Sequence, residues 1–263
     1  MSTSTVHLHA DGRDWDIEYQ WAGDPQATRS LVLLHEGLGS VAMWKGFETS
    51  LAQATRARVL VYSRPGYGLS TPRAVDEVWG PDFMHRQALQ LLPALLDALG
   101  VTTPVTLVGH SDGGSIALIA AAALPQRVCR VVTLAPHTHV EDICITAIEG
   151  LDHAYAHGGL RASLARYHAN VDSAFHGWRN AWLNPAFRSW TLYDELEKID
   201  CPMLAMQGLD DSYGSMEQIQ GIQRRAPQTQ LLEIAQCGHS PHRDQPQIVL
   251  DAIAAFMDQG IRL

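Results

Sequence analysis

The segment from Gly109 to Gly113 has the residue types of a serine nucleophile. It reads GHSDG and fits the pattern G-x-S-x-G, which chance alone would give in roughly one protein of this length in ten. The context makes the pattern informative, because the apolar run VTLVGH leads into it and an Ala-rich run follows it. A strand, a sharp turn and a helix in that order would lift Ser111 on a strained turn at a helix N-terminus. We therefore predict that Ser111 is the nucleophile of an acyl-transfer reaction.

A serine nucleophile needs a base within hydrogen-bond reach and a carboxylate that orients the base. Asp211 follows the apolar run PMLAMQG, and His239 follows the next apolar run and precedes the last helical segment. We predict that His239 accepts the proton of Ser111 and that Asp211 orients the imidazole. Asp210 and His242 are the competing residues, because each lies close in the sequence to the preferred one.

The elements that would position these residues alternate along the chain. Short apolar runs predict strands that are buried on both faces, as in a parallel sheet, and helix-length segments lie between them. An antiparallel hairpin around the turn signal Asp11-Gly12 is predicted at the start. The sequence therefore predicts an α/β fold. The predicted strands are 6–10, 14–21, 30–35, 58–63, 105–110, 130–135, 201–207 and 230–234, and the predicted helices are 43–54, 83–99, 115–124 and 247–257.

The strand pattern stops between residues 137 and 199, where the sequence is rich in Ala, His and Trp. About sixty residues exceed an ordinary loop, so we interpret this segment as a helical insertion. We predict a core domain formed by residues 1–136 and 200–263 and a helical cap formed by residues 137–199. The aromatic residues of the cap are expected to form its own core more often than they line the pocket. They are Phe175, Trp178, Trp182, Phe187 and Trp190.

The composition excludes several classes of partner. The 263 residues are 46% hydrophobic, which is enough for a sizeable core, and the formal net charge of -9 provides no basic surface for nucleic acid. The first residues have no signal-peptide pattern, and no apolar run is long enough to span a membrane, so a cytoplasmic protein is expected. The four cysteines are scattered and read as reduced, mostly buried thiols. A metal site at His137, His139, Glu141 and Asp142 is a weaker alternative, because no second spaced pair completes it.

The segments described above resemble the α/β-hydrolase fold superfamily, of the type with a helical cap. The matching segments are HEGLGSVAMW, SRPGYGLS, GHSDGG, Gly208 to Asp211 and Gly238-His239, and they span nearly the whole chain. The resemblance implies a mostly parallel central sheet with an antiparallel N-terminal hairpin, helices on both faces and a helical cap insertion. It also favours Asp211 over Asp210 as the triad acid, because the family carboxylate commonly follows the glycine by three residues.

The resemblance assigns the oxyanion hole to the backbone N–H groups of Gly37 and Asp112. Relatives usually have glycine where this chain has Glu36, and they often have aspartate where this chain has Ser63 before Arg64. Our hypothesis is that Glu36 supplies the missing carboxylate and pairs with Arg64, so that the buried charges are compensated. A role for Glu36 as a general acid or base is the weaker alternative. His35, at the end of a strand, is expected to be a hydrogen-bonded structural residue.

The resemblance implies a serine hydrolase that acts on a small-molecule carboxylic ester or lactone, with no metal or organic cofactor. Hydrolysis of a C–C bond in a ring-cleavage product is the alternative reaction, and a receptor-like relative that only binds its ligand is the alternative class. A small-molecule substrate is the expected partner, nucleic acid and membrane are not, and the sequence leaves monomer and homodimer open.

Overall fold

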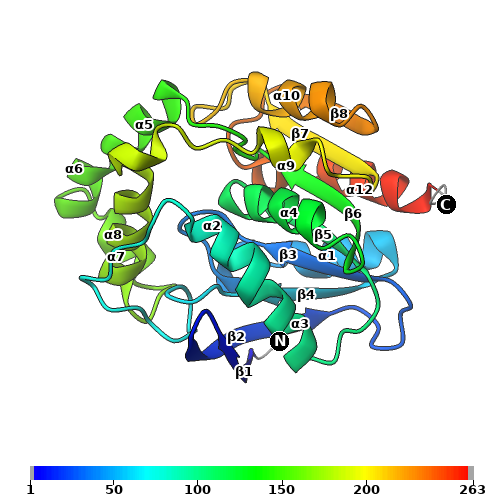
Figure 1. The fold of residues 1–263 in the computed structure, drawn as a ribbon, viewed down its shortest axis with the longest axis horizontal. Helices are drawn as coiled ribbons and strands as arrows, with labels where there is room; N and C mark the ends of the chain where they lie inside the picture. The colour runs from blue at the N-terminus through cyan, green and yellow to red at the C-terminus, as the bar shows by residue number, and fades with distance from the viewer. Residues whose placement is uncertain (1–2, 260–263) are drawn as a thin grey trace.

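An eight-stranded sheet forms the centre of the molecule in the computed structural model, which describes residues 3–259 (Figure 1). The strand order is β1-β2-β4-β3-β5-β6-β7-β8. The pairs β1/β2 and β2/β4 are antiparallel, and every later pair is parallel. The strands are β1 (Ser4–Ala10), β2 (Arg13–Ala22), β3 (Ser30–Leu34), β4 (Arg58–Tyr62), β5 (Val105–His110), β6 (Val128–Leu134), β7 (Met203–Gly208) and β8 (Thr229–Ile234).

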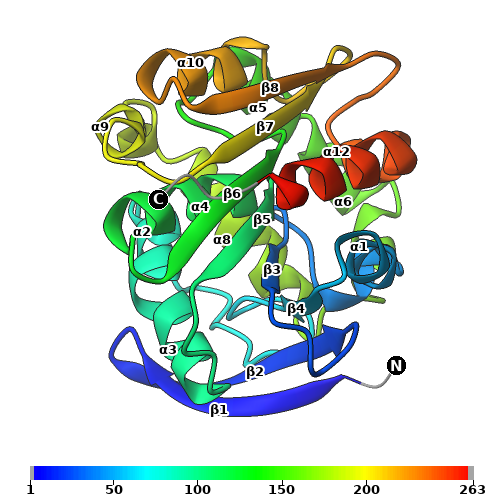
Figure 2. The same ribbon diagram turned by 90° about the vertical axis from the view of Figure 1, so that its right-hand side faces the viewer.

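Helices cover both faces of this sheet (Figure 2). On one face α1 (Phe47–Thr55) packs against α12 (Pro246–Asp258), and on the other lie α3 (Leu92–Ala98), α4 (Asp112–Ala123) and α10 (Glu217–Arg225). The central strands therefore have apolar layers on both sides, which explains why β3 and β5 are buried at every residue. The remaining helices of the core are η1 (Val41–Trp44), α2 (Phe83–Arg86), η2 (Gln87–Leu91) and α11 (Pro241–Asp244).

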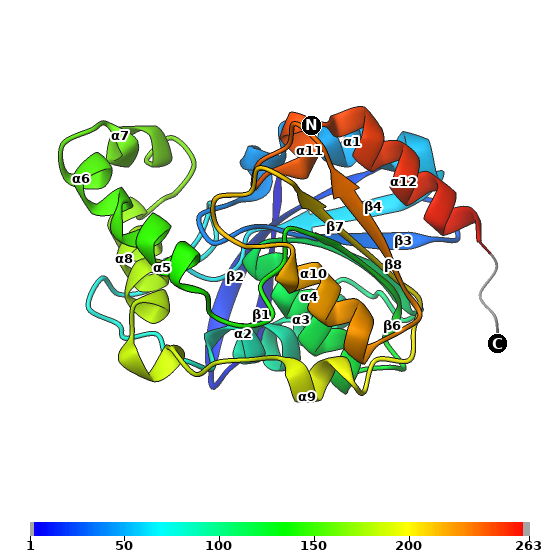
Figure 3. The same ribbon diagram turned by 90° about the horizontal axis from the view of Figure 1, so that it is seen from above.

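A helical insertion lies between β6 and β7. Its helices α5 to α8 lie beyond the carboxyl ends of the parallel strands, whereas α9 returns to the core and packs against α4 (Figure 3). The insertion thus faces the edge of the sheet where loops such as the one after β5 emerge. Its helices are α5 (Asp142–Glu149), α6 (Leu151–Ala156), α7 (Leu160–Leu164), α8 (Val171–Trp182), η3 (Pro185–Phe187) and α9 (Tyr193–Leu196).

The predicted fold class is confirmed, with differences at the level of elements. The hairpin turns at Asp11 and Gly12, both with positive φ, as the sequence indicates. The first core helix begins later than predicted, because a 3-10 turn at 41–44 and the positive-φ residues Lys45 and Gly46 precede it. The helices α10 and α11 were not predicted. Within residues 3–259, no helix combines the length and the apolar character that crossing a membrane requires.

Candidate active site

Ser111 lies in the turn between β5 and α4, in a strained backbone conformation. Its φ is 54° and its ψ is -121°, values that residues with a side chain rarely adopt. A hydrogen bond ties the turn to the neighbouring strand β6, because the Ser111 N–H donates to the carbonyl oxygen of Leu134 at 2.9 Å. Close approach of α4 to the sheet requires a glycine at 113, where a Cβ atom would overlap the carbonyl oxygen of Leu34. The sharp turn therefore presents the Ser111 side chain above the carboxyl end of β5.

Three side chains from three separate loops meet at this turn. His239 Nε2 lies 2.9 Å from Ser111 Oγ, and His239 Nδ1 lies 2.9 Å from both carboxylate oxygens of Asp211. The Asp211 side chain is only 1% exposed, and its Oδ1 also accepts the Tyr213 N–H at 2.8 Å. The arrangement has a hydroxyl, an imidazole and a carboxylate in hydrogen-bond sequence, which is what removal of the serine proton requires.

The surroundings of His239 and Asp211 lower the pKa of both side chains. Burial lowers the pKa of His239, although the hydrogen bond and the charge of Asp211 oppose it. Burial would raise the pKa of Asp211, but the hydrogen bond and charge of His239 together with the hydrogen bond from the Tyr213 N–H outweigh burial and lower that pKa. The imidazole is therefore neutral at neutral pH and can accept a proton, while the carboxylate behind it is charged.

The competing residues lie elsewhere. Asp210 is exposed, and its backbone N–H bonds to the carbonyl oxygen of Cys237. His242 is buried with its ring centroid 4.9 Å from that of Trp44 and 5.5 Å from that of Phe47. The structure thus brings together the pair chosen from the sequence, Asp211 and His239, and leaves the two alternatives away from Ser111.

The predicted oxyanion donors, Gly37 and Asp112, flank the same pocket as Ser111. Asp112 is the first residue of α4, so its N–H has no partner within the helix. Within residues 3–259 the N–H of Gly37 donates to no backbone carbonyl. Trp178 of α8 packs directly on Gly37, where any side chain would overlap the indole nitrogen. A glycine is therefore required here by contact with the insertion.

The Asp112 side chain points away from water. It is 1% exposed, and its Oδ1 accepts the Trp182 indole N–H at 3.1 Å. Burial raises the pKa of Asp112 to about 6, although Arg64 and the indoles of Trp182 and Trp178 act in the opposite direction. This carboxylate is thus poorly compensated, in contrast to that of Asp211.

The hypothesis that Glu36 pairs with Arg64 is wrong. Arg64 Nη2 donates to the main-chain carbonyl of Glu36 at 2.8 Å, whereas the Glu36 carboxylate lies 3.5 Å from His110 Nδ1 and 3.4 Å from Arg243 Nη2. Burial would raise the pKa of Glu36, but His110, Arg243 and His242 outweigh burial and hold it well below its usual value. The carboxylate beside the oxyanion donors is therefore neutralised by cationic and polar neighbours other than the one predicted.

A different carboxylate stands beside Ser63. Glu18 of β2 is 4% exposed, and its Oε2 accepts both the Ser63 hydroxyl at 2.7 Å and the Leu69 N–H at 2.9 Å. Sequence reasoning missed Glu18, because a glutamate in an alternating strand gives no sign that it points inward. His35 behaves as predicted, since it is fully buried with Nδ1 2.7 Å from the Glu36 carbonyl and Nε2 accepting the Arg64 N–H at 3.0 Å.

His110 is a second residue that the sequence did not single out, although it lies inside the GHSDG motif. It is 1% exposed, and its Nε2 lies 2.6 Å from the carbonyl oxygen of His239. Because a carbonyl only accepts, His110 donates to it and thereby holds the main chain of the residue that carries the base. The distance in sequence between 110 and 239 is the reason that no local pattern indicates this contact.

A pocket of about 220 Å³ opens beside Ser111 between the core and the insertion. Its polar side includes Glu36, His239 and Arg243 from the core, and most of its apolar lining comes from the insertion. The aromatic residues of the insertion have two different locations. Trp178 and Trp182 line the pocket, whereas Phe175 stacks on Tyr155 and does not line it. The apolar lining from the insertion consists of Cys144, Ile148, Leu151, Trp178 and Trp182.

Comparison with known proteins places this arrangement in a family. The sequence pattern of the Alpha/beta hydrolase family matches residues 31–252. The sn-1-specific diacylglycerol lipase ABHD11 of Mus musculus is 25% identical, and the match covers 97% of this chain and 90% of the relative. The 2-hydroxy-6-oxo-6-phenylhexa-2,4-dienoate hydrolase of Comamonas testosteroni is also 25% identical, over 87% of this chain and 86% of the relative. Among solved structures, the esterase RhEst1 from Rhodococcus sp. ECU1013 matches with a TM-score of 0.73 and 23% identity, covering 98% of this chain and 99% of that chain.

Proposed function

We propose, on the premise that the chain belongs to the alpha/beta hydrolase family, that it is a serine hydrolase of small carboxylic esters or lactones. The observation that carries the proposal is the hydrogen-bond sequence from Ser111 through His239 to Asp211, with 2.9 Å at each step. The names of two similar proteins, a lipase and an esterase, support ester hydrolysis as the reaction class.

In the proposed reaction, Ser111 Oγ attacks the substrate carbonyl while His239 Nε2 takes the hydroxyl proton. The negative charge that develops on the carbonyl oxygen is bound by the N–H groups of Gly37 and Asp112. His239 then gives the proton to the leaving group, and water enters to hydrolyse the acyl-enzyme by the same steps in reverse. Asp211 keeps Nδ1 protonated and stabilises the imidazolium. All the protein groups used in these steps belong to this chain, and water is the second nucleophile.

The pocket supports a small substrate. A volume of about 220 Å³ suits a short acyl or alkoxy group, and the apolar wall from the insertion favours an uncharged hydrocarbon part. A polymer would have to pass between the insertion and the core, so it is not the proposed substrate. Cys144 lies in the apolar wall, where burial raises the pKa of its thiol far above the ordinary value, so it is not a competing nucleophile.

Hydrolysis of a C–C bond is the second candidate reaction. The observation that favours it is the similarity to a hydrolase named for a ring-cleavage product, which covers 87% of this chain. The same triad and the same pocket would serve both reactions, so the site geometry does not separate them.

The test compares hydrolysis of p-nitrophenyl acetate and butyrate by the wild type and by Ser111→Ala, together with intact mass after treatment with a fluorophosphonate. We expect ester turnover by the wild type, a single adduct on Ser111, and loss of both in Ser111→Ala. An adduct without ester turnover would shift the proposal to C–C hydrolysis, which 2-hydroxy-6-oxodienoates then test, or to ligand binding alone. A wild-type protein that forms no adduct and hydrolyses no ester would refute the serine hydrolase.

A further inference from the structure

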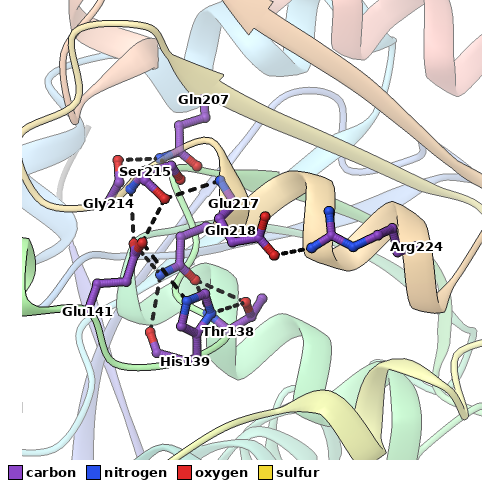
Figure 4. Close-up of polar contacts among 9 residues, drawn as sticks. All are labelled: Thr138, His139, Glu141, Gln207, Gly214, Ser215, Glu217, Gln218 and Arg224. Carbon is purple, nitrogen blue, oxygen red and sulfur yellow. Dashed lines mark hydrogen bonds and ion pairs between the residues drawn. The ribbon is translucent and has the colours of Figure 1, made fainter.

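A polar cluster joins the start of the insertion to the loop that carries Asp211 (Figure 4). At its centre Gln218 of α10 is fully buried and uses both ends of its amide. Its Oε1 accepts the N–H of Thr138 at 2.7 Å and the hydroxyl of Thr138 at 2.9 Å. Its Nε2 donates to the carbonyl oxygen of His139 at 3.1 Å and to Glu141 Oε2 at 2.7 Å. No bonding position of this amide is left to water.

Glu141 continues the cluster to the loop between β7 and α10. Its two carboxylate oxygens accept the Ser215 N–H at 2.9 Å and the Ser215 hydroxyl at 2.6 Å. From the other side, Gln207 of β7 donates through Nε2 to the carbonyl oxygens of Gly214 at 2.8 Å and Ser215 at 3.0 Å. The segment 214–215 is therefore held between a strand of the core and the first residues of the insertion. We call Thr138, His139, Glu141, Ser215 and Gln218 the clamp.

Asp211 lies inside the loop that the clamp holds. The loop leaves β7 after Gly208, and Asp211 is the third residue beyond that glycine and the fourth before Ser215. Glu141 is also the residue that directly precedes helix α5, so a movement of this helix moves the carboxylate that binds Ser215. We propose that Glu141 and Gln218 are positioning residues that couple the place of the insertion to the orientation of Asp211. This inference rests on the proposed function, in which Asp211 orients His239.

Coupling of this kind has a catalytic consequence that simple stabilisation does not. A displacement of about 1 Å at a group that orients the base can lower a rate by up to about 100-fold, while the fold stays intact. In this structure the clamp is formed and Asp211 lies 2.9 Å from His239 Nδ1. A displacement of the clamp would take this carboxylate out of alignment. Catalytic competence is then tied to the position of the insertion.

The decisive variant is Gln218→Glu, which keeps the shape of the side chain and puts a second carboxylate against Glu141. Two ionised carboxylates in contact repel each other, so one of them holds a proton at low pH and the repulsion appears when that proton is lost as the pH rises. The other charged groups near this pair are His139, with Nε2 3.9 Å from Glu141 Oε1, and Arg225, which covers Tyr193 beside His139. Glu217 and Arg224 of α10 pair with each other.

We expect the rate of fluorophosphonate labelling of Ser111 in Gln218→Glu to match the wild type within about threefold at pH 5.5 and to fall about tenfold or more below it at pH 8. Hydrogen exchange of residues 209–216 should rise at pH 8 in the same variant. The double variant Glu141→Gln/Gln218→Glu has only one carboxylate in the clamp, so its ratio to the wild type should no longer depend on pH.

A matched control lies on the same helix. Gln220 Nε2 donates to Glu233 Oε1 at 3.2 Å in an exposed position, so Gln220→Glu also brings a glutamate against a glutamate but leaves the clamp untouched. We expect labelling and exchange in Gln220→Glu to follow the wild type at both pH values. If Gln218→Glu does not fold, Ser215→Ala takes its place, because it removes one hydroxyl from the clamp and introduces no charge.

Ser215→Ala also gives a readout of the base itself. A misplaced Asp211 stabilises the imidazolium less, so the pKa of His239 falls and the acid limb of the labelling rate moves to lower pH. The other titratable groups facing His239 are Glu36, His110, His137 and Tyr213. None of them belongs to the clamp, and burial raises the pKa of Tyr213, so this phenol stays neutral over the acid limb.

The coupling would be overturned by clamp variants that keep three wild-type values. These are the labelling rate of Ser111, the hydrogen exchange of residues 209–216 and the acid limb of the labelling rate. The clamp would then be purely structural. Absence of an adduct in the wild type is a different result. It would remove the proposed function, and the hydrogen exchange of 209–216 would then decide whether the clamp holds the loop.

Discussion

Three buried carboxylates near Ser111 differ in how their charge is compensated. Asp211 is matched by the imidazole of His239, and Glu36 lies between His110 and Arg243. Asp112 has the indoles of Trp182 and Trp178 and the charge of Arg64, which together do not outweigh its burial. The pairing of Asp211 serves the proposed proton transfer, and the pairing of Glu36 compensates a negative charge near the proposed oxyanion donors. Asp112 carries a desolvation cost that should be measurable.

Replacing Asp211 by Asn should abolish most of the activity without unfolding the protein. The amide cannot stabilise the imidazolium and favours the wrong tautomer of His239, so we expect kcat to fall by about 10³-fold or more. Steady-state kinetics with p-nitrophenyl acetate provide the measurement. Asp210→Asn is the matched control, because this neighbouring carboxylate is exposed, and its kcat should stay within about twofold of the wild type. Equal losses in the two variants would contradict the choice of Asp211.

Asp112 should make stability depend on pH in the unusual direction for a carboxylate. Its pKa is raised from 3.8 to about 6, so the folded state binds more protons than the unfolded state between about pH 4 and 6. Stability is therefore lost as the pH rises through this window, by on the order of 2–3 kcal/mol as an upper bound. We expect Asp112→Asn to be more stable than the wild type at pH 7.5 but not at pH 4, as measured by urea unfolding. A difference between the two proteins that is the same at both pH values would exclude this role of Asp112.

At the scale of elements, the sharp connection from β5 to α4 determines where the nucleophile stands. Helix α4 is buried along almost its whole length, and it can run close to β3 because its second and third residues, Gly113 and Gly114, have no side chain. The closeness allows Ser111 to sit at the helix N-terminus and still contact a base from the other end of the chain. The strain at Ser111 is stored there at the expense of overall stability.

Two glycines in helices should respond oppositely to replacement by alanine. A Cβ atom at Gly113 would overlap the carbonyl oxygen of Leu34, so Gly113→Ala should cost about 2 kcal/mol or more. At Gly221 of α10 the nearest atoms are 3.6 Å and 3.8 Å away, so Gly221→Ala should gain about 0.5–1 kcal/mol. Thermal unfolding measures both changes. Similar shifts in the two variants would mean that helix propensity alone, and not the contact with β3, decides the effect at Gly113.

At the scale of the whole molecule, the pocket exists only because the insertion folds back over the carboxyl edge of the sheet. The core supplies the proposed nucleophile, base and oxyanion donors, and the insertion supplies most of the apolar lining. Selectivity and chemistry are therefore divided between two parts of the chain, and the clamp at Glu141 is one place where they connect.

Shortening Trp178 should change which acyl chains are accepted. The indole fills the pocket next to Gly37, so Trp178→Ala should raise kcat/KM for p-nitrophenyl hexanoate relative to acetate by about tenfold or more, since each added methylene is worth about 1 kcal/mol in an apolar pocket. Trp190→Ala is the control, because Trp190 packs on Phe187 and does not line the pocket. The hexanoate to acetate ratio of this control should equal that of the wild type. An unchanged ratio in Trp178→Ala would mean that the acyl group binds elsewhere.

The sequence alone determined the strand series, the sharp turn at Ser111 and the choice of Ser111 and His239, because each depends on local patterns and on their order along the chain. The choice of Asp211 over Asp210 came from the resemblance to the α/β-hydrolase fold superfamily. Buried parallel strands read as apolar runs, and a turn between strand and helix reads as glycines around a serine. The helices α10 and α11 escaped this reasoning, since they are short and their apolar residues are few.

Only the tertiary structure decided which charges meet. The partners of Glu36 come from residues 110 and 243, and the carboxylate beside Ser63 comes from residue 18, so the contacts join segments that are far apart in sequence. A long side chain such as that of Glu36 can reach several neighbours, and the surrounding space decides which one it contacts. Gly39 leaves the space that the Glu36 carboxylate occupies, because a Cβ atom there would overlap it. Local sequence patterns record the direction of the backbone but not this competition, which is why the predicted pairing of Glu36 with Arg64 failed while the predicted fold class was confirmed.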